Sequence, residues 1–340
     1  MKRDSKVTIR DVAQLAGVSP GTVSKIIHET GSFKDETRQR VLDAIDKLNF
    51  QPNIIARSLK TQRTLTLGLV TDDIEGVFTM SMMRGVHGAA RANGFDVFLC
   101  NSFGDTGSEA NELRSLLAKQ VDGIILMSGY RVRERGAPLI PLEQTPVVYL
   151  YQYTLDMPVP CVIPDDEQGG WLGTQHLINL GHTRIGFING PSHYEATHQR
   201  LAGYRRALES SDLTFEPRLV VSGKWYESSG YRLAHELMTL SKPPTAIFCA
   251  SDSIAVGVLE ALREHGLIVP HDIALVGFDN RSFAADKRPP LTTVALPLCE
   301  MGTMAGELLI EAVLNGTPSA GIQRVPCQLV VRESCGTQQA

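Results

Sequence analysis

The sequence lacks a long apolar run and any pairing pattern among its cysteines. Its 340 residues include no window of about 18 apolar residues, and no apolar stretch of signal-peptide type follows the charged start MKRDSK. We therefore expect a cytoplasmic protein without a membrane partner. The six cysteines are scattered with no CxxC pair, so we expect no metal site, no disulfide framework and no cofactor.

Several enzyme motifs are also missing. The sequence contains no GxGxxG, GxxxxGK[ST], GxSxG or HExxH. The adjacent Asp165 and Asp166 could hold a metal ion, but capping of the following helix is the simpler interpretation. The nine histidines are dispersed. We predict that the chain is not an enzyme.

Basic residues outnumber acidic ones in the first 65 positions, and acidic residues outnumber basic ones in the rest of the chain. Residues 1–65 contain 12 lysines and arginines against 7 aspartates and glutamates, a charge of +5, whereas the rest contains 21 against 30, a charge of −9. A basic head on an acidic body suggests that the head alone meets a polyanion.

The stretch VTIRDVAQLAGVSPGTVSKII, residues 7–27, predicts two short helices joined by a tight turn. Thr8 can cap the first helix, and Gly17 can adopt the positive φ that ends it. Ser19 followed by Pro20 begins the second helix. This pattern indicates a helix-turn-helix.

A third helix is predicted over DETRQRVLDAIDKLNF, residues 35–50, where apolar residues recur at helical spacing and Asp35 is a plausible cap. The segment 51–64, QPNIIARSLKTQRT, begins at a proline break and contains one more short helical turn in a basic linker. Three short helices of this kind form about the smallest bundle that can bury a core.

From residue 66 the pattern becomes that of an α/β protein. Short runs that are apolar on both faces predict buried parallel strands at 65–71, 96–102, 122–129, 146–151, 184–190, 245–251 and 273–279. Helical segments such as 108–119 and 253–266 alternate with them. About ten strands are more than one compact sheet of this length carries, so we predict two α/β lobes with a cleft between them.

Seven stretches occur in a fixed order along the chain: TIRDVAQLAGVSPGTVSKII, ARSLK, VDGIILM, LGHTRIGFINGP, RLAGYRRAL, PTAIFCASDSIAVGVLEALREHGLIVPHDIALVGFDN and PPLTTV. Together they resemble the lactose-repressor/galactose-repressor (LacI) family of bacterial transcription regulators over essentially the whole chain. The resemblance implies a helix-turn-helix DNA-binding head, a hinge helix, and a periplasmic-binding-protein-like core with parallel sheets that senses a small molecule and dimerises.

The resemblance also implies domain boundaries. The head would span 1–51, the hinge helix and linker 52–65, and the core 66–340. Within the core, the first lobe would take about 66–163 and 294–324, and the second about 164–293 and 325–340.

The first turn of the second helix in a helix-turn-helix touches base edges. The resemblance implies Pro20, Gly21 and Lys25 as the base readers. Pro20 and Gly21 offer no side-chain hydrogen bond, and Lys25 discriminates between bases less than an arginine would. We therefore expect few direct base contacts, with specificity that depends on Lys25, the hinge and DNA shape. The residues placed to bond phosphates, each with helix capping as its alternative role, are Thr8, Ser19, Thr22, Ser24 and Asn53.

The segment IIARSLK, residues 54–60, is too short to persist as a helix alone in water. The resemblance places it in the minor groove at the operator centre, with Leu59 as a wedge between base pairs. Arg57 and Lys60 would hold the DNA backbone beside it. The alternative is that Leu59 packs against the core.

The effector site implied by the resemblance consists of Asp72, Phe78, Arg200, Trp225, Ser251 and Asp279. Charged groups of this kind bond paired hydroxyls, and an aromatic side chain covers the apolar face of a sugar ring. Arg200 and Asp279 are the central pair, because a charge in such a crevice is costly without a partner. The alternatives are a salt bridge without ligand for this pair and plain packing for Trp225 and Phe78.

Three departures from the family pattern make this site less polar than a simple hexose site. Ser251 replaces a frequent asparagine, Leu296 a frequent glutamine, and Tyr151 a frequent acidic residue. A phosphorylated sugar, a sugar acid and a nucleobase all stay open, with Arg200 available for an anion.

We therefore predict a homodimeric transcriptional repressor that binds a pseudo-palindromic operator in double-stranded DNA and is controlled by a small molecule, a sugar or sugar derivative. Linkage allows an inducer or a corepressor equally. One alternative is an extracytoplasmic solute-binding protein, which the basic head and the missing signal peptide disfavour. The other is a corepressor-dependent regulator with a nucleobase-type ligand.

Overall fold

The computed structural model describes residues 7–27, 30–50, 63–128, 145–154, 159–316 and 320–336. The chain divides into two compact units, Met1–Thr64 and Leu65–Ala340. Asn53, Arg57, Leu59 and Lys60 lie outside the described residues, so the predictions made for them stay predictions.

The first unit contains three helices: α1 (Ile9–Ala16), α2 (Pro20–Ile27) and α3 (Asp35–Leu48). The backbone N–H and the hydroxyl of Thr8 both donate to the Asp11 carboxylate at 2.7 Å, and Gly17 ends α1 with a φ of 66°. Val12, Val23 and Val41 are fully buried at the centre of the bundle. The prediction of Asp35 as a cap was wrong by one residue, because Lys34 occupies the cap position and Asp35 begins α3.

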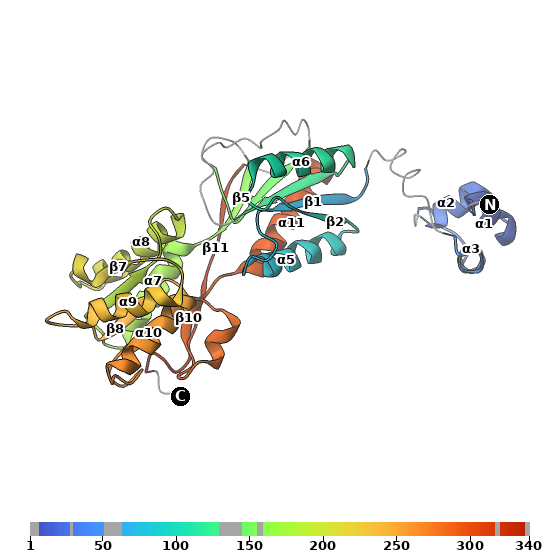
Figure 1. The fold of residues 1–340 in the computed structure, drawn as a ribbon. Coiled ribbons are helices and arrows are strands. Elements are labelled where there is room, and N and C mark those ends of the chain that lie inside the picture. The colour runs from blue at the N-terminus through green and yellow to red at the C-terminus, as the bar shows by residue number, and fades with distance from the viewer. Residues whose placement is uncertain are drawn as a thin grey trace, which may run out of the picture. The chain divides into compact units, whose positions relative to one another are not determined.

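The second unit is built on two six-stranded sheets, each in its own lobe in Figure 1. The first sheet runs in the order β11 (Gly321–Val325), β5 (Pro160–Pro164), β4 (Val147–Leu150), β3 (Gly123–Met127), β1 (Thr66–Thr71), β2 (Asp96–Asn101). The second runs in the order β12 (Gln328–Val330), β10 (Thr292–Ala295), β9 (Ala274–Asp279), β8 (Ala246–Cys249), β6 (Ile185–Asn189), β7 (Val220–Ser222). Neighbouring strands are parallel except β12, which is antiparallel to β10.

Helices cover both faces of each sheet, which is why central strands such as β3 and β8 are buried along their whole length (Figure 1). The helices of the first lobe are α5 (Thr79–Ala92), α6 (Thr106–Ala118) and α11 (Leu298–Asn315). Those of the second are α7 (Asp166–Asn179), α8 (Glu195–Glu209), α9 (Glu227–Met238) and α10 (Asp252–Glu264), with the short 3-10 helices η1 (Pro217–Leu219) and η2 (Ser282–Asp286). None of the helices in the described ranges is long and apolar enough to cross a membrane.

The chain passes between the two sheets three times, after Pro164, after Ala295 and after Val325. The second passage follows β10, which ends at Ala295. This interleaving makes each lobe depend on distant parts of the sequence, and it brings the carboxyl ends of the strands toward the connections between lobes. Ligands of open α/β sheets bind at such strand ends.

Candidate functional site

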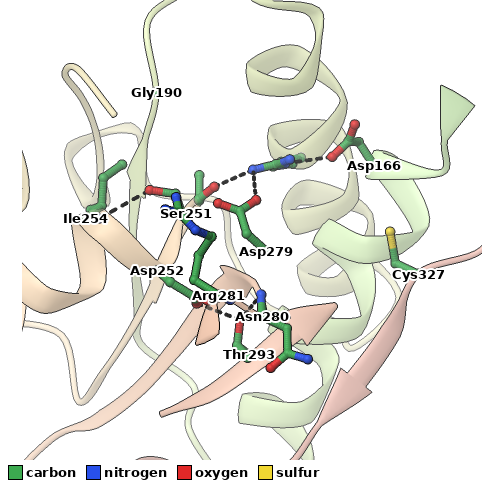
Figure 2. A network of polar contacts seen from close by, with 12 residues as sticks. Asp166, Gly190, Ser251, Asp252, Ile254, Asp279, Asn280, Arg281, Thr293 and Cys327 are labelled. Carbon is green, nitrogen blue, oxygen red and sulfur yellow. Dashed lines mark hydrogen bonds and ion pairs between the residues drawn. The ribbon is translucent and has the colours of Figure 1, made fainter. Parts of the chain in front are cut away.

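A buried arginine organises a polar cluster at the carboxyl ends of β8 and β9. Arg200, on α8, is 3% exposed. Its Nε donates to Asp166 Oδ1 at 2.7 Å, and its Nη1 donates to the carbonyl of Ala250 and, at 3.5 Å, to Asp279 Oδ1. Figure 2 shows Asp166, Ser251 and Asp279 converging from three different elements.

Close contact between α7 and α8 sets the distance between Asp166 and Arg200. A Cβ atom on Gly170 of α7 would lie 2.3 Å from the backbone oxygen of Arg200, and one on Gly203 of α8 would lie 2.0 Å from that of Glu167. Only glycine permits backbones to approach this closely. The two helices therefore fix the ion pair through main-chain packing.

Two aromatic rings flank the guanidinium. The Arg200 Cζ lies 3.7 Å from the ring centroid of Phe278 and 5.7 Å from that of Trp225. Stacking of this kind holds the planar guanidinium in place. Trp225 is half-buried, so part of its surface stays open beside the charged cluster.

Asp279 is held in an unusual backbone conformation where β9 ends. Its φ is 104° and that of Asn280 is 51°, two successive residues in the region that favours glycine. Such conformations cost about 1–3 kcal/mol each and gather at functional sites. Burial raises the pKa of Asp279 to about 8, against the opposing effect of Arg200.

The pKa values of the other two members of the cluster, Asp166 and Arg200, are also shifted by burial and by the neighbouring charges. Burial raises the pKa of Asp166, although Arg200 opposes it. Burial would lower the pKa of Arg200, but the charges of Asp166 and Asp279 outweigh burial and raise it. Arg200 therefore stays protonated, whereas burial disfavours the charged forms of its two carboxyl partners.

The prediction that Asp165 and Asp166 both cap a helix was half right. The Asp165 carboxylate accepts from the backbone N–H of Gln168 at 3.0 Å and caps α7. Asp166 is fully buried and pairs with Arg200 instead. Sequence reasoning missed it because the pair is made by residues 34 positions apart, through helix packing that no local pattern displays.

The remaining predicted effector residues differ in their relation to this cluster. Ser251 accepts from the backbone N–H of Ile254 at 3.2 Å and caps α10. Phe78, half-buried at the start of α5, meets the Tyr151 ring edge-on, with 5.9 Å between the ring centroids. Asp72 is half-buried in the loop after β1.

The second helix of the head, α2, presents the expected DNA-reading residues outward. Pro20, Gly21 and Lys25 are exposed, whereas Val23 and Ile26 face the core of the bundle. The residues predicted to contact phosphates have different surroundings. Thr8 caps α1, and Ser19 accepts from the backbone N–H of Thr22 at 3.1 Å and so caps α2. Ser24 is half-buried. The capping roles are thus present, and the exposure of Thr8 and Ser19 leaves them accessible to a phosphate.

Comparisons with known proteins agree with this architecture. Residues 8–53 match the family described as "Bacterial regulatory proteins, lacI family", and residues 174–335 match the "Periplasmic binding protein-like domain". Catabolite control protein A of Priestia megaterium is 34% identical over 96% of this chain and 99% of its own length. The HTH-type transcriptional repressor PurR of Aliivibrio salmonicida is 34% identical over 96% and 98%.

Solved structures of similar proteins cover the same length. The lac repressor dimer bound to operator and the anti-inducer ONPF is 27% identical, with a TM-score of 0.79 over 97% of this chain and 99% of that one. The complex of the transcriptional regulator CelR with cellobiose is 32% identical, with a TM-score of 0.68 over 96% and 99%.

A helix-turn-helix head joined to a two-lobed α/β core defines a bacterial transcription regulator with a ligand-binding body. The identity to full-length relatives places it within that class: the chain belongs to the lacI family of bacterial regulatory proteins. The resemblance inferred from its seven motifs is thereby confirmed, as is the predicted α/β fold with a helix-turn-helix head. The relatives named here are regulators rather than enzymes.

Proposed function

We propose that the protein is a transcriptional repressor that binds an operator as a homodimer and is controlled by a small molecule at the Arg200 cluster. The observation that carries the effector site is the buried Arg200, shared by Asp166 and Asp279 and flanked by the half-buried Trp225. Charged groups beside an open aromatic surface suit a ligand with polar edges and an apolar face, such as a sugar.

The domain arrangement supports control of the head by the core. The compact head ends near residue 64, and the core begins with β1, whose carboxyl end carries Asp72. A ligand that favours one arrangement of the lobes shifts an equilibrium only by its differential affinity for the two states. The segment with Arg57, Leu59 and Lys60 is the element on which we expect such a shift to act.

The DNA-binding half of the proposal rests on α2. Its exposed first turn and Lys25 provide the surface that enters a major groove, while Val23 and Ile26 anchor the helix. A homodimer would present two such helices to a two-fold operator. The relatives named as repressors support repression as the outcome of binding.

Two measurements test this proposal. The first selects bound sequences from a random DNA pool with the full-length protein, and we expect an enriched inverted repeat. The second is a thermal-shift screen against sugars, sugar derivatives and nucleobases, in which a ligand at 100 times its Kd adds about 2.7 kcal/mol of stability. Arg200→Ala and Asp279→Ala should abolish the shift; variants that respond like the wild type would show that the ligand binds elsewhere.

A nucleobase-type corepressor is the second candidate. The half-buried Trp225 and Phe78 offer aromatic surfaces on which a flat base stacks as readily as a sugar ring. Several relatives named as PurR repressors match the chain over nearly its full length. Operator binding that requires a nucleobase, rather than one that a sugar relieves, would favour this candidate.

A further inference from the structure

The Arg200 cluster contains more carboxylates than cations. Two carboxylates, Asp166 and Asp279, face a single guanidinium, and all three side chains are less than one-tenth exposed. Nε and Nη1 of Arg200 are engaged by protein oxygens, and Nη2 makes no hydrogen bond to a described residue. One cation cannot neutralise two carboxylates, so the cluster retains a negative charge or an extra proton.

The imbalance is localised on one atom. Asp166 Oδ2 is buried and has no hydrogen-bond partner within the described part of the chain. In Figure 2 it is the oxygen of Asp166 that no dashed line reaches. Besides Arg200, the positive charge of Arg324, on the edge strand β11, lowers the pKa of this carboxyl. Buried polar atoms are almost always satisfied, and an exception calls for a functional explanation.

We propose that Asp166 is a specificity-determining residue of the effector site, and that the site selects ligands that donate hydrogen bonds from hydroxyl or ammonium groups and carry no anionic group. This inference rests on the proposed function. A hydroxyl or an ammonium group supplies the donor that Oδ2 lacks, and the Nη2 of Arg200 supplies one donor to a ligand oxygen. The site thus matches a neutral or amino-bearing polyol.

An anionic ligand meets opposition from the same geometry. An anion bound at Nη2 would face the Asp166 carboxylate, and any movement of the guanidinium toward the anion would leave that buried carboxylate without its cation. The stacking of the guanidinium on Phe278 at 3.7 Å opposes that movement as well. Sugar acids and phosphorylated sugars, left open by the sequence, are therefore excluded by this arrangement of charges.

The test compares ligands that share a skeleton and differ in charge. Full-length protein is measured by thermal shift and calorimetry with glucose, glucosamine, glucuronate and glucose 6-phosphate, with the corresponding galactose series, and with uracil against orotate. We expect the neutral or amino member of the series that binds to have a Kd at least about tenfold lower than its anionic counterpart, the size of one lost charged hydrogen bond.

The variant Asp166→Asn removes the carboxylate that pairs with Arg200 and keeps the side-chain volume. In this variant, the ratio of the Kd for the anionic ligand to the Kd for its neutral counterpart should fall by about tenfold or more. Asp165→Asn is the matched control, because Asp165 caps α7 one residue away and makes no contact with Arg200 among the described hydrogen bonds. It should preserve the wild-type ratio.

The outcomes separate the two proposals. If an anionic member binds the wild type as tightly as its neutral counterpart, or more tightly, the selection by charge is refuted while the effector site stands. If no member of any series binds, the proposed effector class fails and this inference fails with it. An Asp166→Asn protein with an unchanged ratio would show that Asp166 only supports the helix packing.

Discussion

At the residue scale, Asp279 combines a positive φ with burial beside Arg200, and its protonation links the cluster to pH. A free aspartate has a pKa of about 3.9, whereas the pKa of Asp279 in the folded chain is about 8. Between these values the folded protein holds a proton that the unfolded chain has lost, so stability falls as the pH rises. Asp279→Asn has no such proton, and its thermal stability relative to wild type should therefore increase from pH 5 to pH 8.

Differential scanning calorimetry of both proteins over this range measures the effect. Asp252, with a pKa raised by burial to about 6, contributes a slope of the same sign in both proteins, so the comparison with Asp279→Asn is needed to isolate Asp279. A stability difference that is the same at pH 5 and pH 8 would show that Asp279 is ionised throughout this range.

Lys25 is the second residue whose role can be isolated. It is the exposed cation on α2 after two residues, Pro20 and Gly21, that offer no side-chain hydrogen bond. Lys25→Ala should lose about 1–3 kcal/mol of discrimination at one operator base pair. Lys47→Ala, at the exposed far end of α3, is the control and should keep that discrimination. Quantitative gel shifts with single-base operator variants decide the question, and full retention of preference by Lys25→Ala would overturn the assignment.

At the element scale, backbone contacts between helices keep the cluster together. Gly203→Ala would place a Cβ atom 2.0 Å from the backbone oxygen of Glu167, so α7 and α8 would have to separate. We expect a loss of about 1–3 kcal/mol in unfolding free energy, as for other overpacked sites, together with weakened effector binding. Gly88→Ala, at an exposed position of α5 with open space around it, should instead stabilise by about 1 kcal/mol. Urea unfolding of both variants measures these changes in unfolding free energy. If Gly203→Ala is as stable as Gly88→Ala, the close contact between α7 and α8 does not have the proposed role.

The same scale shows how far the sequence predicts this fold. Strands such as β1 and β9 were located to within a residue, because buried parallel strands form short apolar runs bounded by polar residues. The ends of α1 followed from Thr8 and Gly17, whose local chemistry fixes the backbone. Asp166 was not predicted as a partner of Arg200, since that pairing depends on helix packing through Gly170 and Gly203 rather than on any local pattern.

At the scale of the whole molecule, the proposed repressor couples two binding events, and thermodynamics makes that coupling reciprocal. If the effector changes operator affinity by some factor, operator DNA must change effector affinity by the same factor. We expect a factor of about 5–150, the usual range for such coupling, with its direction distinguishing an inducer from a corepressor. Operator titrations with and without effector give one value, and calorimetric effector titrations with and without operator give the other. Equal values well away from one would establish that the core controls the head, whereas a value of one in both experiments would show that the ligand bound at Arg200 does not regulate DNA binding.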